Sequence, residues 1–219
     1  QRAFPLPHLP ATFGRDCTSH PLSEKVSLLI KTFLPRRFSS EWEWLQARAA
    51  EDPRIVLIAE NLPRDELLAL YSCCDVFLSL HRSEGFGRGM AEALQLGVDV
   101  IATACGGNTD FCTGPLSHPV RWRKAPIPRG SYPYAEGHFW AEPDLMHAAE
   151  LCQQVAHQKL SAGQEFVFSD SRSDRTRSSF CREKLSFIST GSRYLKRLNE
   201  LWADRARVND HLCCQKIRI

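Results

Sequence analysis

The chain has 219 residues and a mass of 24.8 kDa, which is enough for one sizeable domain, or for one domain and a tail. Its composition is that of a soluble globular protein, and its net charge of +3 is too small to indicate nucleic acid or an anionic membrane surface as a partner. No apolar run approaches the roughly 18 residues of a transmembrane helix, and the first residues lack the pattern of a signal peptide. We therefore expect a cytoplasmic protein without a transmembrane segment.

Cysteines are frequent, but they do not form a recognisable framework. Their odd number, their scatter and their places inside apolar patterns favour reduced, mostly buried thiols over disulfides. No set of His and Cys residues has the spacing of zinc ligands, so we expect no metal site. The nine cysteines are Cys17, Cys73, Cys74, Cys105, Cys112, Cys152, Cys181, Cys213 and Cys214.

The first predicted strand follows an irregular, proline-rich lead-in over residues 1–25. The nearly continuous apolar run Val26–Lys31 predicts a buried parallel strand. Lys31 ends this strand on the side where open α/β sheets bind ligands, so it is a candidate contact for a phosphate. A solvated edge lysine is the alternative.

A helix is predicted next, from a cap at Ser39 or Ser40 to Glu51. We expect its apolar stripe, Trp42, Leu45 and Ala49, to lie in the core.

Another strand, Arg54–Ala59, leads to a second helix, which Pro63 favours and which we expect over Asp65–Tyr71. The loop between them contains Asn61 and Leu62.

The most informative stretch is a glycine-rich turn between the apolar run Asp75–Leu80 and a helical pattern that ends at Gly97. A helix N-terminus has unpaired N–H groups and a partial positive charge, which together suit a phosphate. Gly85, Gly87 and Gly89 lack the Cβ atoms that would keep a ligand from the backbone. Strand, turn and helix together predict an anion site.

Two carboxylates lie on either side of this turn. A phosphate would repel Glu84 and Glu92, so they are better suited to accept hydrogen bonds from neutral hydroxyl groups on each side of it. A ligand with hydroxyls, then phosphate, then hydroxyls is a nucleotide sugar. Arg82, at the mouth of the turn, is a candidate to neutralise the diphosphate, with a surface ion pair as the alternative.

Glu84 and Glu92 enclose seven residues, and Gly-Phe-Gly follows the first of them. This pattern resembles the C-terminal, donor-binding half of retaining GT-B glycosyltransferases of the group 1 (family 4) kind. The resemblance runs from about Val26 to about Lys159 and is most specific over Asn61–Phe111. It implies a doubly wound, mostly parallel, Rossmann-like α/β sheet.

The resemblance also implies roles for individual residues. Glu84 would meet the transferred sugar and Glu92 the ribose, while the backbone of the turn would line the diphosphate. Asn61 and Leu62 would touch the nucleobase, with a plain turn as the alternative, and a second glycine turn with Gly106 and Gly107 would flank the sugar. The predicted catalytic residues are Glu84, Arg82 and Lys31, and the predicted donor-binding residues are Gly85, Phe86, Gly87, Arg88, Glu92, Asn61, Leu62, Gly106 and Gly107.

Downstream of the first turn we expect a strand over Val98–Thr103, the second glycine turn, a short strand over Pro119–Trp122, an irregular loop over 123–137 and a helix from Asp144 to about Lys159. The predicted domains are a lead-in over 1–25, a donor-binding domain over 26–160, a Ser/Arg-rich linker over 161–192 and a helix with a tail over 193–219. From residue 161 on, twelve basic residues face seven acidic ones, so RNA or a membrane surface is a minor alternative partner for this tail.

We therefore expect transfer of a hexose-like sugar from a UDP- or GDP-linked donor to a sugar or glycan acceptor, with retention and without metal or cofactor. The family's first strand, its glycine loop and the acceptor-binding half would precede residue 1. A truncated, non-catalytic domain is one alternative. An NAD-dependent oxidoreductase is another, although Met90 stands where the dinucleotide fingerprint needs its last glycine.

Overall fold

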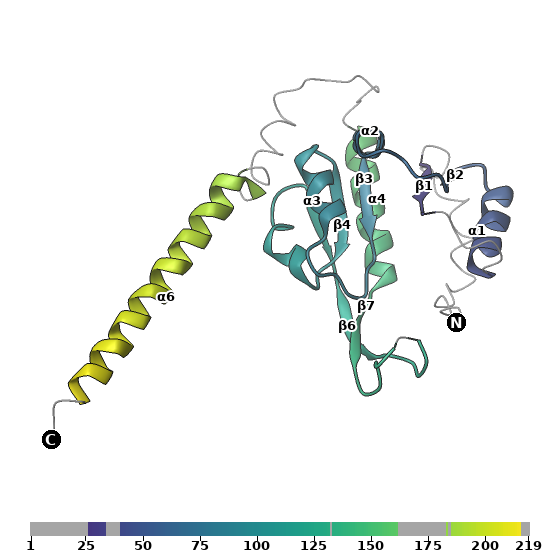
Figure 1. The fold of residues 1–219 in the computed structure, drawn as a ribbon. Coiled ribbons are helices and arrows are strands. Elements are labelled where there is room, and N and C mark those ends of the chain that lie inside the picture. Colours follow the sequence, from purple (N-terminus) through teal and green to yellow (C-terminus); the bar gives the residue numbers. More distant parts are fainter. Residues whose placement is uncertain (1–25, 34–39, 132, 162–182, 184, 216–219) are drawn as a thin grey trace.

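The computed structural model describes residues 26–33, 40–131, 133–161, 183 and 185–215 (Figure 1), and for 204–215 it describes the backbone alone. The predicted lead-in over 1–25 and most of the predicted linker over 161–192 lie outside these residues.

The order of strands and helices agrees with the predicted α/β pattern as far as the second glycine turn. The elements are β1 (Leu28–Lys31), α1 (Ser40–Glu51), β2 (Ile55–Ile58), α2 (Arg64–Ser72), β3 (Val76–Ser79), α3 (Arg88–Gln95), β4 (Asp99–Thr103), the short 3₁₀ helix η4 (Gly107–Asp110), β5 (Ser117–Val120), β6 (Trp122–Pro126), β7 (Phe139–Pro143), α4 (Leu145–Ser161) and α6 (Phe187–Gln215).

The first five strands are parallel to their neighbours, which confirms the predicted mixed α/β class. They form two separate pieces: β1 pairs with β2, and β4 lies between β3 and β5. Among the described residues no strand joins β1 to β3, and Figure 1 shows the β1–β2 pair set apart from the larger sheet. The single doubly wound sheet that we predicted is therefore present as two parallel pieces.

The core lies on the two faces of β4, all five residues of which are buried. Because side chains alternate along a strand, Val100 and Ala102 face α3, whereas Ile101 faces α4. The apolar face of α3 supplies Met90 and Leu94 to the first of these clusters. The packing fixes the start of α3 against the carboxyl end of the sheet.

One charged group lies within this core. Asp99 is 3% exposed, with His118 Nε2 at 2.7 Å from Oδ1 and Lys159 Nζ at 2.9 Å from Oδ2. Burial raises the pKa of the Asp99 carboxyl, but the hydrogen bond of His118 and the charges of Lys159 and His118 outweigh burial and hold the pKa below its ordinary value. These contacts tie β4 to β5 and to α4.

The first two helices are packed differently. Neither α1 nor α2 has a fully buried residue, and the same is true of β1 and β2. The predicted core stripe of α1, residues Trp42, Leu45 and Ala49, is half-buried, so that prediction was wrong. Its apolar side has one two-stranded sheet to pack on rather than a full layer.

The segment predicted as an irregular loop over 123–137 contains part of a hairpin. Strands β6 and β7 pair antiparallel, with Trp122 opposite Pro143 and Pro126 opposite Phe139. Of the prolines that suggested a loop, Pro126 lies at the end of β6, whereas Pro128 and Pro133 lie in the connection between the two strands. The predicted strand Pro119–Trp122 is likewise two elements, since β5 ends at Val120 and β6 begins at Trp122.

Of the helices that the structure describes, none is long and apolar enough to cross a membrane.

Candidate functional site

The first glycine turn connects β3 to α3, as the sequence predicted. Gly87 has a φ of +90°, which favours glycine, and it directly precedes the first residue of α3. A Cβ on Gly89 would lie 2.9 Å from the ring of Phe77. These glycines therefore serve the packing of the turn as well as any ligand that approaches it.

The second glycine turn packs directly on the first. Gly107 N donates to the carbonyl oxygen of Glu84 over 3.3 Å. A Cβ on Gly106 would overlap that same carbonyl oxygen, and a Cβ on Gly107 would overlap the carbonyl oxygen of Gly85. The structure thus places the two turns together at the carboxyl ends of β3 and β4, where the strand order predicts them.

Glu84 closes the first turn on itself. Its Oε1 accepts hydrogen bonds from Gly87 N at 3.0 Å and from Phe86 N at 3.3 Å. Two of the N–H groups expected to line a diphosphate are thus held by this carboxylate. The N–H groups of Arg88 and Gly89, in the first turn of α3, have no acceptor within the helix.

Glu92 lies on α3 with its side chain 12% exposed. Its Oε1 is 3.0 Å from Arg64 Nη1 at the start of α2 and 3.6 Å from Arg88 Nε. Neither approach has the geometry of a hydrogen bond, and among the described residues this buried oxygen has no hydrogen-bond donor. Burial, followed by the charge of Glu92, raises the pKa of the neighbouring Tyr71. Glu92 is thus held by two ion pairs, both through its buried Oε1.

Arg82 is engaged with the hairpin. Its Nε and Nη2 bind the carboxylate of Glu142 at 2.8 and 2.9 Å, and its guanidinium lies 4.4 Å from the ring centroid of Trp140. Ala141 N also donates to the carbonyl oxygen of Arg82 over 3.0 Å. These contacts match the ion pair that we considered as the alternative to a diphosphate contact. A role toward a diphosphate stays a prediction.

His81 is a site residue that the sequence reasoning did not select. Its Nδ1 lies 3.0 Å from Ser79 Oγ, and its Nε2 lies 2.9 Å from the carbonyl oxygen of Cys105. Since a carbonyl can only accept, Nε2 carries a proton, and in the neutral ring Nδ1 then accepts from the Ser79 hydroxyl. The ring therefore links the end of β3 to the second turn. Its position just before the turn was the available signal.

The predicted residues Lys31, Asn61 and Leu62 lie at the end of β1 and in the loop before α2. Lys31 ends β1, with Nζ 2.6 Å from the carbonyl oxygen of Thr32 and 5.4 Å from the ring centroid of Phe33. Asn61 is exposed and Leu62 is half-buried, just before α2. Because α2 starts with Arg64, which reaches Glu92, the Asn61–Leu62 loop is on the Glu92 side of the turn.

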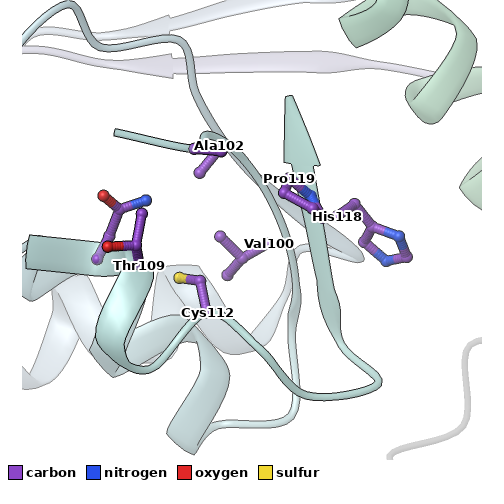
Figure 2. A pocket seen from close by; sticks show the side chains of 8 residues that line it. Val100, Ala102, Thr109, Cys112, His118 and Pro119 are labelled. Carbon is purple, nitrogen blue, oxygen red and sulfur yellow. The ribbon is translucent and has the colours of Figure 1, made fainter. Parts of the chain in front are cut away.

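A cavity of about 180 Å³ lies behind the second turn, between η4 and the edge of the sheet (Figure 2). In Figure 2 Val100 and Cys112 face it, whereas the ring of His118 points away. Neither Glu84 nor Glu92 lines it, and it is smaller than the roughly 300 Å³ at which ligand pockets begin. The candidate site is therefore the open surface over the two glycine turns.

The parallel strands, with helices packed against them, define an α/β protein of Rossmann-like construction. Two glycine turns and the carboxylates of Glu84 and Glu92 form a candidate ligand site at the carboxyl ends of its strands. Residues 40–113 match the family model of group 1 glycosyl transferases. The match runs from α1 to just beyond η4 and includes both acids and both turns. It supports a glycosyltransferase-like enzyme. A comparison with curated proteins found no match.

Proposed function

We propose that residues 26–160 are the donor-binding half of a retaining GT-B glycosyltransferase, which binds a UDP- or GDP-linked sugar and transfers a hexose-like group to a sugar or glycan acceptor. The observation that carries this proposal is the placement of Glu84 and Glu92 on the two sides of the α3 N-terminus, inside the segment that matches the family.

The proposed contacts follow from that placement. The diphosphate lies over the first turn of α3, where the N–H groups of Arg88 and Gly89 and the helix dipole favour negative charge. Glu92 accepts from the ribose hydroxyls with its carboxylate, whose side chain is 12% exposed. Asn61 and Leu62 contact the base, because their loop leads into the helix whose Arg64 reaches Glu92.

On the other side of the turn, Glu84 faces the sugar, with Gly106 and Gly107 next to it. One oxygen of Glu84 holds the turn, and the carboxylate has further lone pairs for sugar hydroxyls. Negative charge on the departing diphosphate is stabilised by the start of α3 and by nearby cations, so the proposed reaction uses neither metal nor cofactor. The acceptor binds to a separate α/β half, and we propose a cytoplasmic setting.

Isothermal titration of the chain with UDP- and GDP-sugars, and separately with NADH, tests this function. We expect a nucleotide sugar to bind and NADH not to bind. Binding of NADH alone would assign the site to an oxidoreductase. If neither ligand binds, the proposed donor site is wrong for this chain.

A non-catalytic glycosyltransferase-like domain is the second candidate. It is favoured by the break between the two parallel sheets and by the lack of fully buried residues in β1, α1, β2 and α2. Nucleotide-sugar binding without hydrolysis or transfer of the sugar would identify this case.

A further inference from the structure

Helix α6 (Phe187–Gln215) leads away from the rest of the protein. Leu185, just before it, packs on the core cluster between β4 and α3, and Ser186 Oγ accepts from Ser189 N at 3.1 Å as a helix cap. Beyond these two residues the helix, yellow-green in Figure 1, extends away from the α/β layers. Whatever covers α6 is therefore not the α/β core.

Between Phe187 and Trp202, the large apolar side chains of α6 are all exposed, by 48% to 95%. At 100° per residue they fall in one continuous sector about 140° wide, with Ile188 and Leu201 at its two edges. The sector consists of Phe187, Ile188, Tyr194, Leu195, Leu198, Leu201 and Trp202. A helix in water gains nothing from such a sector, so its apolar surface needs a partner.

The opposite side of the described helix is polar and mainly cationic. Between residues 187 and 203 it carries Arg193, Lys196 and Arg197, and Glu200 is the one acidic residue. Glu200 lies away from the apolar sector and is 3.2 Å from Arg197. Between residues 187 and 203, the charges nearest to the sector are thus positive on both of its sides.

A second copy of α6 fits this pattern poorly. The sector covers three positions of each heptad rather than the two of a coiled-coil seam, and Gly191 in its middle would leave a hole. Within residues 187–203, pairing two such helices would also bring Lys196 and Arg197 near their own copies, with no acidic residue of this segment beside the seam. Acyl chains, in contrast, fill irregular surfaces.

We propose that α6 is an amphipathic anchor that lies in the interface of an anionic lipid bilayer, with its aromatic and aliphatic sector in the acyl boundary and its cations at the headgroups. A wide apolar sector with Trp and Phe, a basic polar face and a composition that is polar on the whole are the features of such helices. The net charge of the whole chain conceals this local surplus. The inference does not depend on the proposed function.

Flotation of the purified full chain with vesicles tests the anchor. One set is phosphatidylcholine alone, and the other contains phosphatidylglycerol as about a third of the lipid. We expect at least about tenfold stronger partitioning onto the anionic vesicles, because each surface cation contributes a factor of about five. Leu198→Glu should reduce partitioning at least about tenfold, since it removes a buried leucine and adds an anion.

Two further variants separate the contributions. Met146→Glu makes the same kind of change at an exposed apolar residue of α4, and we expect it to partition like the wild type. Lys196→Gln keeps the apolar sector, so it should weaken only the preference for anionic vesicles, by about fivefold.

Equal binding to both vesicles, no binding at all, or equal loss in Leu198→Glu and Met146→Glu would overturn the proposal. Light scattering with size-exclusion chromatography adds one more decisive outcome. A dimer that Leu198→Glu dissociates, together with no vesicle binding, would show that a second copy covers the helix.

Discussion

Residues 26–72 and residues 76–161 contain the same kinds of elements, yet they are packed very differently. In the second region β4 has a strand on each side and a helix on each face, and its five residues are all buried. In the described part of the first region β1 has one neighbouring strand, β2, and none of the region's strands or helices has a fully buried residue. Apolar strands become a core only where both faces and both edges are covered.

The candidate site includes residues from both regions. Glu84 and the two glycine turns rest on the packed region, whereas Asn61, Leu62 and Lys31 belong to the region without a core. The approach of Arg64 to Glu92 joins the two at the site. Donor binding would thus add contacts where the protein itself has few.

The largest expected effect contrasts one leucine from each region. Leu94→Ala, at a fully buried position, should lower the free energy of unfolding by about 4 kcal/mol. Leu28→Ala, at a position 46% exposed, should cost about 1 kcal/mol, because much of its surface is already in water. Urea unfolding at neutral pH measures both. Equal losses would contradict the comparison.

The ion pairs of Asp99 make the stability of the packed region depend on pH. Asp99→Asn should cost about 3 kcal/mol at neutral pH, because it leaves Lys159 and His118 without their buried anion. Since the folded pKa of Asp99 lies below its unfolded value near 4, its contribution is present above about pH 4 and is lost as the pH falls through the folded pKa. Urea midpoints of the two proteins at neutral pH and below pH 4 measure this loss.

In the variant, the acid-side decline should be smaller than in the wild type. An unchanged decline would assign acid sensitivity to other carboxyl groups.

The contact between the glycine turns gives the next effect. Gly107→Ala should cost about 2 kcal/mol, since its Cβ would overlap the carbonyl oxygen of Gly85 and push the turns apart. Gly85→Ala is the matched control, because nothing lies within 4 Å of a Cβ built there, and we expect a change below about 1 kcal/mol. Thermal unfolding of both variants is the measurement, and reversed effects would refute the described contact.

Features of the structure that depend on residues close together in the chain could be predicted from the sequence, whereas features that depend on distant residues could not. The pattern around β3, α3 and β4 is local, and it predicted both glycine turns and their adjacency correctly. The hairpin β6–β7 was missed, because its pairing joins residues on either side of a proline-rich loop. The break between β1 and β3 follows from which strands find neighbours, and an apolar run does not carry that information.

Side-chain partners were the least predictable part of the site. The sequence placed Arg82 and Glu84 at the turn, but not the pairing of Arg82 with Glu142, which is 60 residues away. Nor did it indicate that Glu84 would accept from Gly87 N within its own turn. Such partners depend on the folded positions of distant elements, in this case the hairpin.

The central claim is that Glu92 binds the donor rather than supporting the fold. Calorimetric titration of wild type, Glu92→Gln and the exposed-site control Glu150→Gln with the nucleotide sugar that the wild type binds tests it most directly, with a thermal melt of each protein alongside. We expect Glu92→Gln to weaken binding about tenfold or more, because a hydrogen bond to a charged acceptor is lost, and to melt within a few degrees of wild type, because Arg64 and Arg88 are largely exposed. Glu150→Gln should match the wild type in both. Unchanged affinity in Glu92→Gln, or loss of binding only because that variant unfolds, would contradict the account.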